Sequence, residues 1–285
     1  MTEFENKTAL ITGAASGFGY EFAKECTKRG MNTVLVDIDK KRLSEADKAI
    51  SAHNPNTLTV CADVSIYEEV QRAIKMTLDR YKTLDLLINN AGVYFVGNIW
   101  DMPLRDYRWM LDVNVLSIVY GMKEAIPVMM RQGTPCHILN TASIAGCIAA
   151  KGMSAYHMTK HAVVALSESV LLDLQKAKAH IGISVFCPGF VKTDLHNCER
   201  HRPERYKAED PYYDSAIYQK NVALVDQFIT TGEPVDPIAQ IVFQAIEEKR
   251  FYIKTEATDK MYGPWLKKRF DNIVNNDNPD VSHLY

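Results

Sequence analysis

The alternation of short apolar runs with longer amphipathic stretches constrains this chain most. Runs that predict strands are residues 7–12, 32–37, 57–62, 84–89, 136–141 and 181–187, with a seventh at about 250–254. Helical patterns lie between them at residues 17–30, 39–53, 65–81, about 104–131, 154–178 and about 235–249. Several runs are apolar throughout, which is typical of strands covered on both faces. The alternation therefore predicts an α/β fold with a doubly wound parallel sheet.

The 285 residues fit one domain over residues 1–285, and the pattern changes after the sixth strand. Residues 195–232 are polar and rich in tyrosine, with Tyr206, Tyr212, Tyr213 and Tyr218. Ligands of open α/β sheets bind at the carboxyl edge of the sheet, so we expect a helical substrate lid there; a surface excursion without a role is the alternative. The C-terminal extension, about 255–285, either covers a neighbouring active site or is a solvated extension.

Charge and composition exclude several classes of protein. The net charge is -2 and basic residues form no long run, so nucleic-acid binding has no electrostatic support. The N-terminus has no apolar segment of a secretory signal, and no apolar run approaches the ~20 residues of a membrane helix. We therefore expect no membrane span and a cytoplasmic location.

Cysteine and histidine spacing predicts neither disulfides nor a metal site. The six cysteines include no C-x-x-C pair, so reduced and mostly buried thiols are expected, at Cys26, Cys61, Cys136, Cys147, Cys187 and Cys198. His157 and His161 have the spacing of helical metal ligands, but no suitably spaced third ligand is evident. We expect both in solvent or at a subunit interface, and we expect Trp100, Trp109 and Trp265 to pack.

A glycine loop follows the first strand run. Thr12-Gly13-Ala14-Ala15-Ser16-Gly17-Phe18-Gly19 lies between a predicted strand and a predicted helix, which is the context that a dinucleotide-binding loop needs. Glycines permit a tight turn and close backbone approach to a pyrophosphate, which the helix N-terminus attracts. The loop therefore predicts a Rossmann-type fold. The loop residues expected at the cofactor are Gly13, Ser16, Gly17, Phe18 and Gly19.

Aspartates at two strand ends extend this expected cofactor site. Asp37 can accept hydrogen bonds from both adenosine ribose hydroxyls and would repel a 2′-phosphate, which favours NAD over NADP. Lys40, Lys41 and Arg42 lie close behind and weaken this discrimination. Asp63 can bond the adenine amino group. Both aspartates could instead cap the following helices. The residues expected around adenosine are Asp37, Ile38, Asp63 and Val64.

Tyr156 and Lys160 are four residues apart in a predicted helix and so share one face. Hydride reduction of a ketone leaves an alkoxide that needs a proton, and a neighbouring ammonium lowers the pKa of a phenol. A loop from strand to helix can bring Ser143 opposite Tyr156, where its hydroxyl would stabilise charge on the substrate oxygen. Lys160 can also bond the nicotinamide ribose. The Y-x-x-x-K pair alone is weak, since exposed helices carry it by chance.

The set of motifs resembles the short-chain dehydrogenase/reductase family over about residues 5–253. The glycine loop, Asn89-Asn90-Ala91-Gly92, Asn114, Ser143, Tyr156, Lys160 and Pro188-Gly189 stand in that family's order and spacing. One departure is Ser117, where the family usually has glycine. The resemblance implies that Tyr156 is the general acid/base, that Lys160 activates it, and that Ser143 stabilises the substrate oxygen.

The resemblance also implies roles for the flanking segments. Asn114 would anchor a water in a proton relay through a local break in its helix. Asn90, Ala91 and Gly92 would pack beside adenosine. Pro188, Gly189, Val191 and Thr193 would complete the cofactor site, Val191 and Thr193 by holding the carboxamide. The family's subunit contacts imply a homodimer or homotetramer.

The sequence therefore predicts an NAD-dependent oxidoreductase of a secondary alcohol or ketone. A non-catalytic dinucleotide-sensing protein on the same fold is the alternative, although such a protein would be expected to lose Ser143, Tyr156 or Lys160. An epimerase or dehydratase is a third possibility, but this sequence lacks the T-G-x-x-G-x-x-G loop of those enzymes. Expected pocket residues, besides the lid tyrosines, are Val93, Tyr94, Phe95, Ala145, Gly146 and Met153. They suggest a bulky apolar small molecule as substrate, with a steroid-like compound as the specific expectation.

Overall fold

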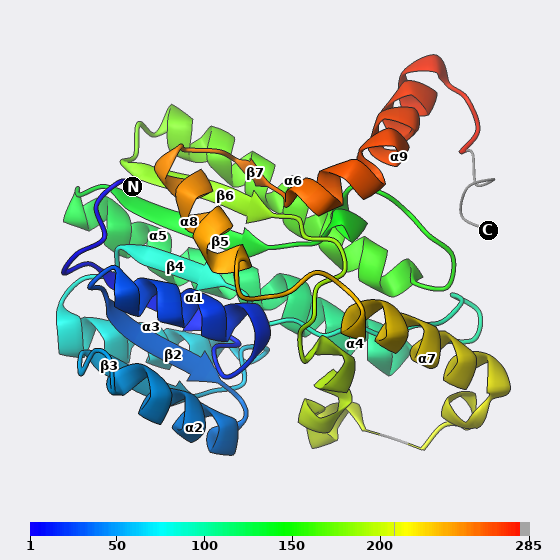
Figure 1. Cartoon of the computed structure of the whole chain (residues 1–285), viewed down its shortest axis with the longest axis horizontal. Coiled ribbons are helices and arrows are strands. Elements are labelled where there is room, and N and C mark those ends of the chain that lie inside the picture. The colour runs from blue at the N-terminus through cyan, green and yellow to red at the C-terminus, as the bar shows by residue number, and fades with distance from the viewer. Residues whose placement is uncertain (208, 280–285) are drawn as a thin grey trace.

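The computed structural model describes residues 1–207 and 209–279, and its strands form one parallel sheet of seven strands (Figure 1). The strands are β1 (Thr8–Thr12), β2 (Asn32–Asp37), β3 (Thr57–Cys61), β4 (Leu86–Asn89), β5 (Cys136–Thr141), β6 (Ile181–Phe186) and β7 (Tyr252–Ile253). Their order in the sheet is β3-β2-β1-β4-β5-β6-β7, and every pair of neighbours is parallel. This confirms the doubly wound Rossmann-type sheet predicted from the alternation.

Helices cover both faces of the sheet, and each face has its own apolar core. One core includes residues of α1 (Gly17–Lys28), α2 (Lys40–Ser51) and α8 (Ile238–Glu247). The other includes residues of α3 (Tyr67–Tyr81), α5 (Ser117–Gln132) and α6 (Ser154–Lys176). Side chains alternate between the two, since Leu10 belongs to one core while Ala9 and Ile11 belong to the other. Two-sided burial explains why the strand runs are apolar throughout.

Two predicted helices differ from their sequence-based bounds. The helix expected at 104–131 consists of α4 (Leu104–Leu111), a π turn (Asp112–Leu116) and α5, so the expected break at Asn114 is present. The helix expected at 65–81 begins at Tyr67. Its N-cap residue is Ile66, and the Ser65 N–H donates to the carboxylate of Asp63, which holds the turn before the helix.

The segment Leu104–Gln132 is long and apolar enough, by length and composition, to cross a membrane. No continuous apolar run marks this segment in the sequence, because charged residues such as Lys123 and Glu124 interrupt it. Its inner residues, including Met110 and Ile118, are buried in the core beside the sheet. The segment therefore packs as a core helix of this domain.

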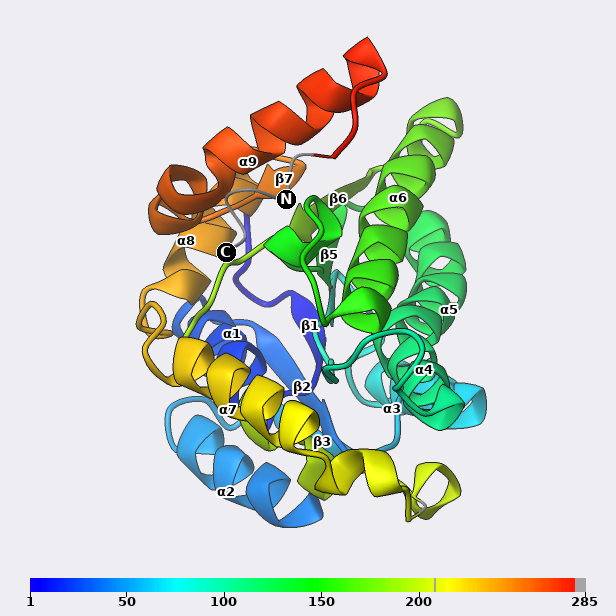
Figure 2. The ribbon, with the colours of Figure 1, turned by 90° about the vertical axis from the view of Figure 1, so that its right-hand side faces the viewer.

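The lid and the C-terminal helix lie at the carboxyl end of the sheet (Figures 1 and 2). After β6 the chain forms short 3-10 turns at Leu195–His201, Glu204–Tyr206 and Pro211–Asp214, and then α7 (Ala216–Thr230). The tail forms α9 (Glu256–Asn275), which starts beside the sheet edge and projects away from the body. Viewed onto this edge, α9 lies at the top and α7 lies below it (Figure 2).

Candidate active site

The glycine loop runs from β1 into α1 at the point where the strand order reverses, between β1 and β4. Gly13 has a φ of +64°, and a Cβ on it would lie 2.9 Å from the Cα of Ala91. A Cβ on Gly19 would lie 2.1 Å from the carbonyl oxygen of Gly13. Both positions therefore exclude any side chain. Asn90 closes the loop from the β4 side, since its Nδ2 donates to Thr12 O at 3.0 Å.

The carboxylate of Asp37 joins the glycine loop to the turn before α2. It accepts from Ala15 N at 3.0 Å and from Asp39 N at 2.9 Å. The alternative in which Asp37 caps α2 is wrong, because the carboxylate of Asp39 accepts from Lys41 N and Arg42 N. Asp37 borders the cavity beside this loop, where an adenosine ribose would lie next to a carboxylate.

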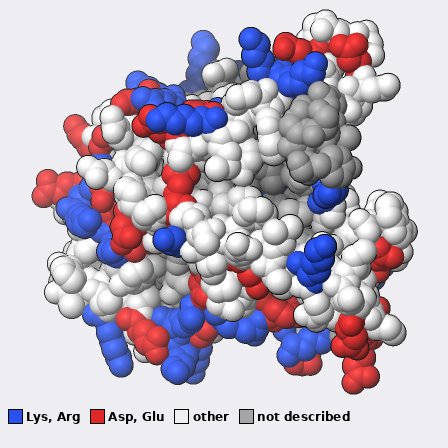
Figure 3. Space-filling model, turned by 45° about the vertical axis from the view of Figure 1, so that its right-hand side comes forward, with Lys and Arg blue, Asp and Glu red and all other residues white. Residues whose placement is uncertain are grey.

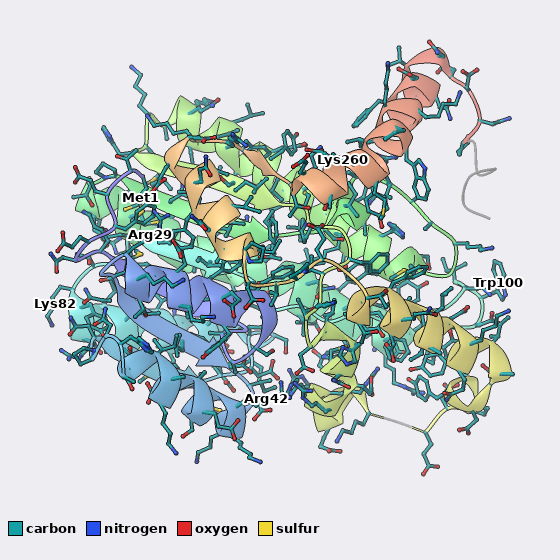
Figure 4. All side chains as sticks on the ribbon, in the orientation of Figure 1. Met1, Arg29, Arg42, Lys82, Trp100 and Lys260 are labelled. Atoms are coloured by element: carbon teal, nitrogen blue, oxygen red, sulfur yellow. The ribbon has the colours of Figure 1, made fainter. Side chains whose placement is uncertain are left out.

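The first lid turns cover this adenosine end of the cavity. The carboxylate of Asp194 pairs with both Arg42 and Arg200, and the side chain of Arg42 reaches from α2 toward these turns (Figure 4). Arg205 donates to the carboxylate of Asp63 at 2.7 Å. Asp63 therefore holds a lid arginine as well as the turn before α3. Sequence reasoning missed this contact, because 142 residues separate the two side chains.

Ser143, Tyr156 and Lys160 meet at the carboxyl ends of β5 and β6. The Ser143 hydroxyl is close enough to the Tyr156 phenol to influence its pKa, and it donates to Pro188 O at 3.4 Å. Lys160 Nζ donates to Thr141 O at 3.0 Å and lies 5.6 Å from the centre of the Tyr156 ring. The three side chains thus form one cluster, as their spacing and the strand-to-helix loop predict.

Burial dominates the protonation of this cluster. It raises the pKa of Tyr156 to about 12, although the neighbouring Ser143 hydroxyl acts in the opposite direction. It lowers the pKa of Lys160 to about 8, because the ammonium loses water without gaining a close carboxylate. The predicted fall in the Tyr156 pKa is therefore absent from the protein alone. It would require a positive charge closer to the phenol.

Asn114 is buried in the π turn, and its amide is fully engaged. Its Oδ1 accepts from Val93 N at 2.8 Å, and its Nδ2 donates to Val93 O and to Thr159 Oγ1. A Cβ on Gly92 would lie 3.5 Å from Asn114 Oδ1 and 3.7 Å from Lys160 Nζ, so the π turn lies beside the catalytic cluster. Since these bonds use the side chain to hold the segment that follows β4, a water bound at this turn would have to use its backbone atoms.

One cavity of about 1180 Å³ joins these parts, which exceeds the ~300–1,000 Å³ usual for a single ligand pocket. Its walls include every predicted catalytic and cofactor residue except the buried Gly19 and Asn114. The loop after β6 contributes Pro188, Gly189, Val191 and Thr193. Thr193 lies against the glycine loop, since a Cβ on Gly17 would be 3.2 Å from Thr193 Cβ.

The predicted substrate pocket is correct in part. Val93, Tyr94, Ala145 and Met153 line the cavity, whereas Phe95 and Gly146 do not. Phe95 is buried under the lid, where its ring stacks on Tyr218 at 5.5 Å. Gly146 packs against α6, and a Cβ there would lie 2.5 Å from Lys160 O.

The lid tyrosines hold the lid in place by hydrogen bonds and do not line the cavity. The hydroxyl of Tyr212 donates to Val96 O at 2.7 Å, that of Tyr206 to Asp112 at 2.6 Å, and that of Tyr213 to Asp106 at 3.1 Å. Their expected role in the pocket is therefore wrong. Polar hydroxyls on apolar rings suit them to this place, because the ring is buried while the oxygen finds a partner.

Two contributions to the site were missed by sequence reasoning. The first part of α9 lines the cavity of its own chain with Thr258, Met261, Tyr262 and Trp265. The Thr258 hydroxyl accepts from Gly189 N at 2.8 Å, which ties α9 to the loop after β6. Neither alternative offered for the extension included this. The only signal in the sequence is the helical pattern of residues 256–275. That pattern lies beyond the usual length of the family.

His157 is the second missed contribution, because it is buried and braces the loop after Ser143. Its Nδ1 donates to Ala145 O at 2.8 Å, and Ala150 N donates to its Nε2 at 3.0 Å. Burial lowers its pKa, which keeps the ring neutral for these two bonds. The expectation that His157 is solvated or at an interface is wrong for this chain. Among the described residues, no group of three metal-ligating side chains is present.

The three tryptophans differ in their surroundings. Trp109 is fully buried and packs as expected, and Trp265 lines the cavity. Trp100 is 79% exposed and points away from the body, so the packing predicted for it is wrong (Figure 4).

The geometry can perform acid–base chemistry beside a bound dinucleotide. A phenol, a hydroxyl and an ammonium converge on one wall, and a glycine loop with the N-terminus of α1 forms another. The surface around the opening consists mainly of uncharged residues, with a few lysines or arginines at its rim (Figure 3).

Comparisons with known proteins agree with this arrangement. The short chain dehydrogenase family matches residues 7–204. A protein of Lactiplantibacillus plantarum, CLA biosynthesis dehydrogenase/reductase, is 43% identical over 282 residues, which cover 99% of this chain and 98% of that protein. D-beta-hydroxybutyrate dehydrogenase of Rhizobium meliloti (strain 1021) is 34% identical over 192 residues, 66% of this chain and 73% of that protein. The crystal structure of a short chain dehydrogenase/reductase from Burkholderia phymatum in complex with NAD has a TM-score of 0.94 and 34% identity, and the match covers 98% of each chain.

Proposed function

Because the chain belongs to the short-chain dehydrogenase/reductase family, we propose that it interconverts a secondary alcohol and a ketone with NAD(H). One observation carries the proposal. The phenol of Tyr156 meets the Ser143 hydroxyl beside Lys160, in the same cavity as the glycine loop. A dinucleotide-sensing protein needs the loop but has no use for this cluster.

The residues around the adenosine end fit NAD. A Cβ on Gly13 or Gly19 would fill the cradle beside the N-terminus of α1, and Asp37 places a carboxylate where a 2′-phosphate would be repelled. The Burkholderia phymatum structure in complex with NAD supports the same choice. When bound, the nicotinamide would accept hydride from an alcohol or supply it to a ketone.

Tyr156 would move the proton. In the oxidation, the Tyr156 phenolate would take the hydroxyl proton of an alcohol whose carbinol hydride the nicotinamide would accept. Ser143 would donate a hydrogen bond to the same oxygen, which holds the substrate against Tyr156 and stabilises charge there. Ketone reduction reverses these steps, with Tyr156 as the acid.

Lys160 and a cationic nicotinamide would together have to lower the pKa of Tyr156 for this proton transfer to run near neutral pH. The pKa of Lys160, about 8, leaves most of it protonated at pH 7, so it places a positive charge near a phenol whose pKa is about 12. A cationic nicotinamide would add a second positive charge. Each unit by which the phenol pKa falls corresponds to about 1.4 kcal/mol of interaction with these charges.

We place the substrate among apolar secondary alcohols. The cavity wall beyond Tyr156 is built from apolar side chains such as Val225, Phe228 and Met261. The Lactiplantibacillus plantarum relative is named a CLA biosynthesis dehydrogenase/reductase. That name supports a dehydrogenase or reductase reaction for this chain. The steroid-like substrate expected from the sequence stays a prediction.

Absorbance of NADH with a panel of secondary alcohols and ketones tests this proposal. We expect turnover of apolar members and a higher kcat/KM with NADH than with NADPH. Tight NADH binding without turnover of any member would favour the sensing protein instead. A higher kcat/KM with NADPH would contradict the role of Asp37 while leaving the reaction class intact.

A further inference from the structure

The helices α7 and α9 each turn one side toward the cavity. Residues 217, 221, 224 and 228 of α7 line it, and their spacing places them on a single helix face. Residues 258, 261, 262 and 265 of α9 line it in the same way. The two lining faces are largely apolar, so the cavity continues outward from Tyr156 along two apolar walls.

Large apolar side chains on these walls remain open to water. Leu224 and Phe228 of α7 are 48% and 45% exposed, and Met261 of α9 is 62% exposed. They sit beside a catalytic cavity instead of scattered over the surface. Exposed apolar side chains grouped beside a pocket mark a place where an apolar ligand is buried. An extended, flexible chain would cover them while one carbon of that chain stays at Tyr156.

Charge is distributed unevenly along the cavity. Most charged residues of its described lining gather at the adenosine end: Asp37, Asp39, Arg42, Asp63, Asp194 and Arg200. Lys160 belongs to the catalytic cluster, and the Glu233 carboxylate accepts from the hydroxyl of Thr255 at 2.7 Å. Lys151 lies elsewhere, in the loop before α6, where its side chain is exposed at the cavity wall.

The loop that carries Lys151 faces α7. Gly152 follows Lys151, and a Cβ on it would lie 3.9 Å from the amide nitrogen of Asn221. Lys151 and Asn221 both line the cavity, and the chain neighbour of Lys151 lies against Asn221. An ammonium and an amide N–H are both donors to a carboxylate, and the exposed rim lets that carboxylate keep part of its water.

Resting on the proposed function, we propose that the substrate is an open-chain hydroxy or oxo fatty acid. Its aliphatic chain lies along the lining faces of α7 and α9, and its carboxylate is recognised by Lys151 and Asn221. The reacting carbon, held at Tyr156 and Ser143, lies within the chain. Lys151 is then a specificity residue that takes no part in the proton transfer.

The carboxylate contact is tested with a mid-chain hydroxy fatty acid and its methyl ester as paired substrates. The wild type should show a kcat/KM about two- to fivefold higher for the acid, the range of an exposed ion pair. Lys151→Met should bring this ratio to about one, with most of the loss in KM. Lys176→Met, an exposed lysine at the opposite end of α6, is the matched control and should keep the wild-type ratio.

An unchanged acid-to-ester ratio in Lys151→Met would overturn the carboxylate site. Hydroxy acids of about 8 to about 18 carbons test the chain path, where kcat/KM should rise by about two- to fourfold for each methylene that becomes buried. Met261→Ser should lower kcat/KM more for long chains than for short ones. A flat dependence on length, or a preference for rigid polycyclic alcohols, would overturn the open-chain substrate. Absence of turnover with every alcohol would instead refute the proposed reaction.

Discussion

At the scale of single residues, burial fixes the protonation of side chains inside this sheet. His137 of β5 is 2% exposed, and its pKa falls from 6.5 to about 3 because the charged ring would lose its water. Ser184 Oγ donates to Arg250 O, so the hydroxyl accepts from His137 Nε2 at 2.9 Å. Among the described residues His137 Nδ1 has no hydrogen-bond partner, so protonation of the ring would create an unsatisfied donor there.

The His137 ring makes stability depend on pH in a predictable direction. The neutral ring contributes fully to the free energy of unfolding above pH 6.5. This contribution is lost as the pH falls, because the unfolded chain then binds a proton that the folded chain does not bind. Between pH 7 and pH 5 this costs about 2 kcal/mol. We expect His137→Gln, which can still donate to Ser184, to reduce the acid sensitivity of urea unfolding by that amount. Equal sensitivity in the two proteins would show that His137 is protonated in the fold.

The cofactor-binding residues could be predicted because the sequence motif consists of the residues that the loop conformation requires. The glycine loop needs glycines at fixed positions, and Gly13 and Gly19 do lie where a Cβ would clash. The role of His157 could not be predicted in this way. Its two partners, Ala145 and Ala150, contribute only backbone atoms, so their sequence carries no signal of the contact.

At the scale of elements, a buried arginine joins the lid to α4. Arg202 is 5% exposed, and its guanidinium lies 4.3 Å from the Trp109 ring centre and 4.9 Å from that of Phe95. It donates to the fully buried carboxylate of Asp106 at 2.6 Å. A buried ion pair is strongly destabilising to break, because the remaining charge has no solvent.

Removing Arg202 should therefore weaken the whole lid. We expect Arg202→Met to lower the free energy of unfolding by about 3 kcal/mol and to make the lid a preferred site of limited proteolysis. Arg80→Met is the matched control, since Arg80 is exposed and lies over the Tyr81 ring at 5.1 Å. If the two variants unfolded alike, the lid would not depend on this ion pair.

The lid and the tail show where prediction at the element scale reaches its limit. The lid position follows from its place after β6, because connections at that edge cross the ligand cleft. Which lid residues face inward depends on tertiary packing. Tyr212 and Tyr213 turn toward α4 and the strand ends, while Leu224 and Phe228 face the cavity. For α9, the helical pattern alone does not predict which part of the molecule the helix packs against.

At the scale of the whole molecule, function follows from where the strands end. The parallel sheet brings the ends of β1, β4, β5 and β6 to one edge, so residues far apart in the chain share one cavity. This much could be predicted, because alternating strands and helices leave few topologies open. The homodimer or homotetramer stays a prediction. Met158 and Leu172 on α6 are exposed large apolar side chains, which such an assembly could bury.

The most direct test of the proposed reaction is Tyr156→Phe, with turnover and NADH affinity measured on the same protein. We predict that kcat falls by about 10²–10⁴-fold, the usual contribution of a general acid or base, while the Kd for NADH changes little. Tyr120→Phe, on α5 and packed edge-on against Tyr67, should match the wild type in both measurements. Full turnover by Tyr156→Phe would contradict the account, because the proton would then reach the substrate by another group.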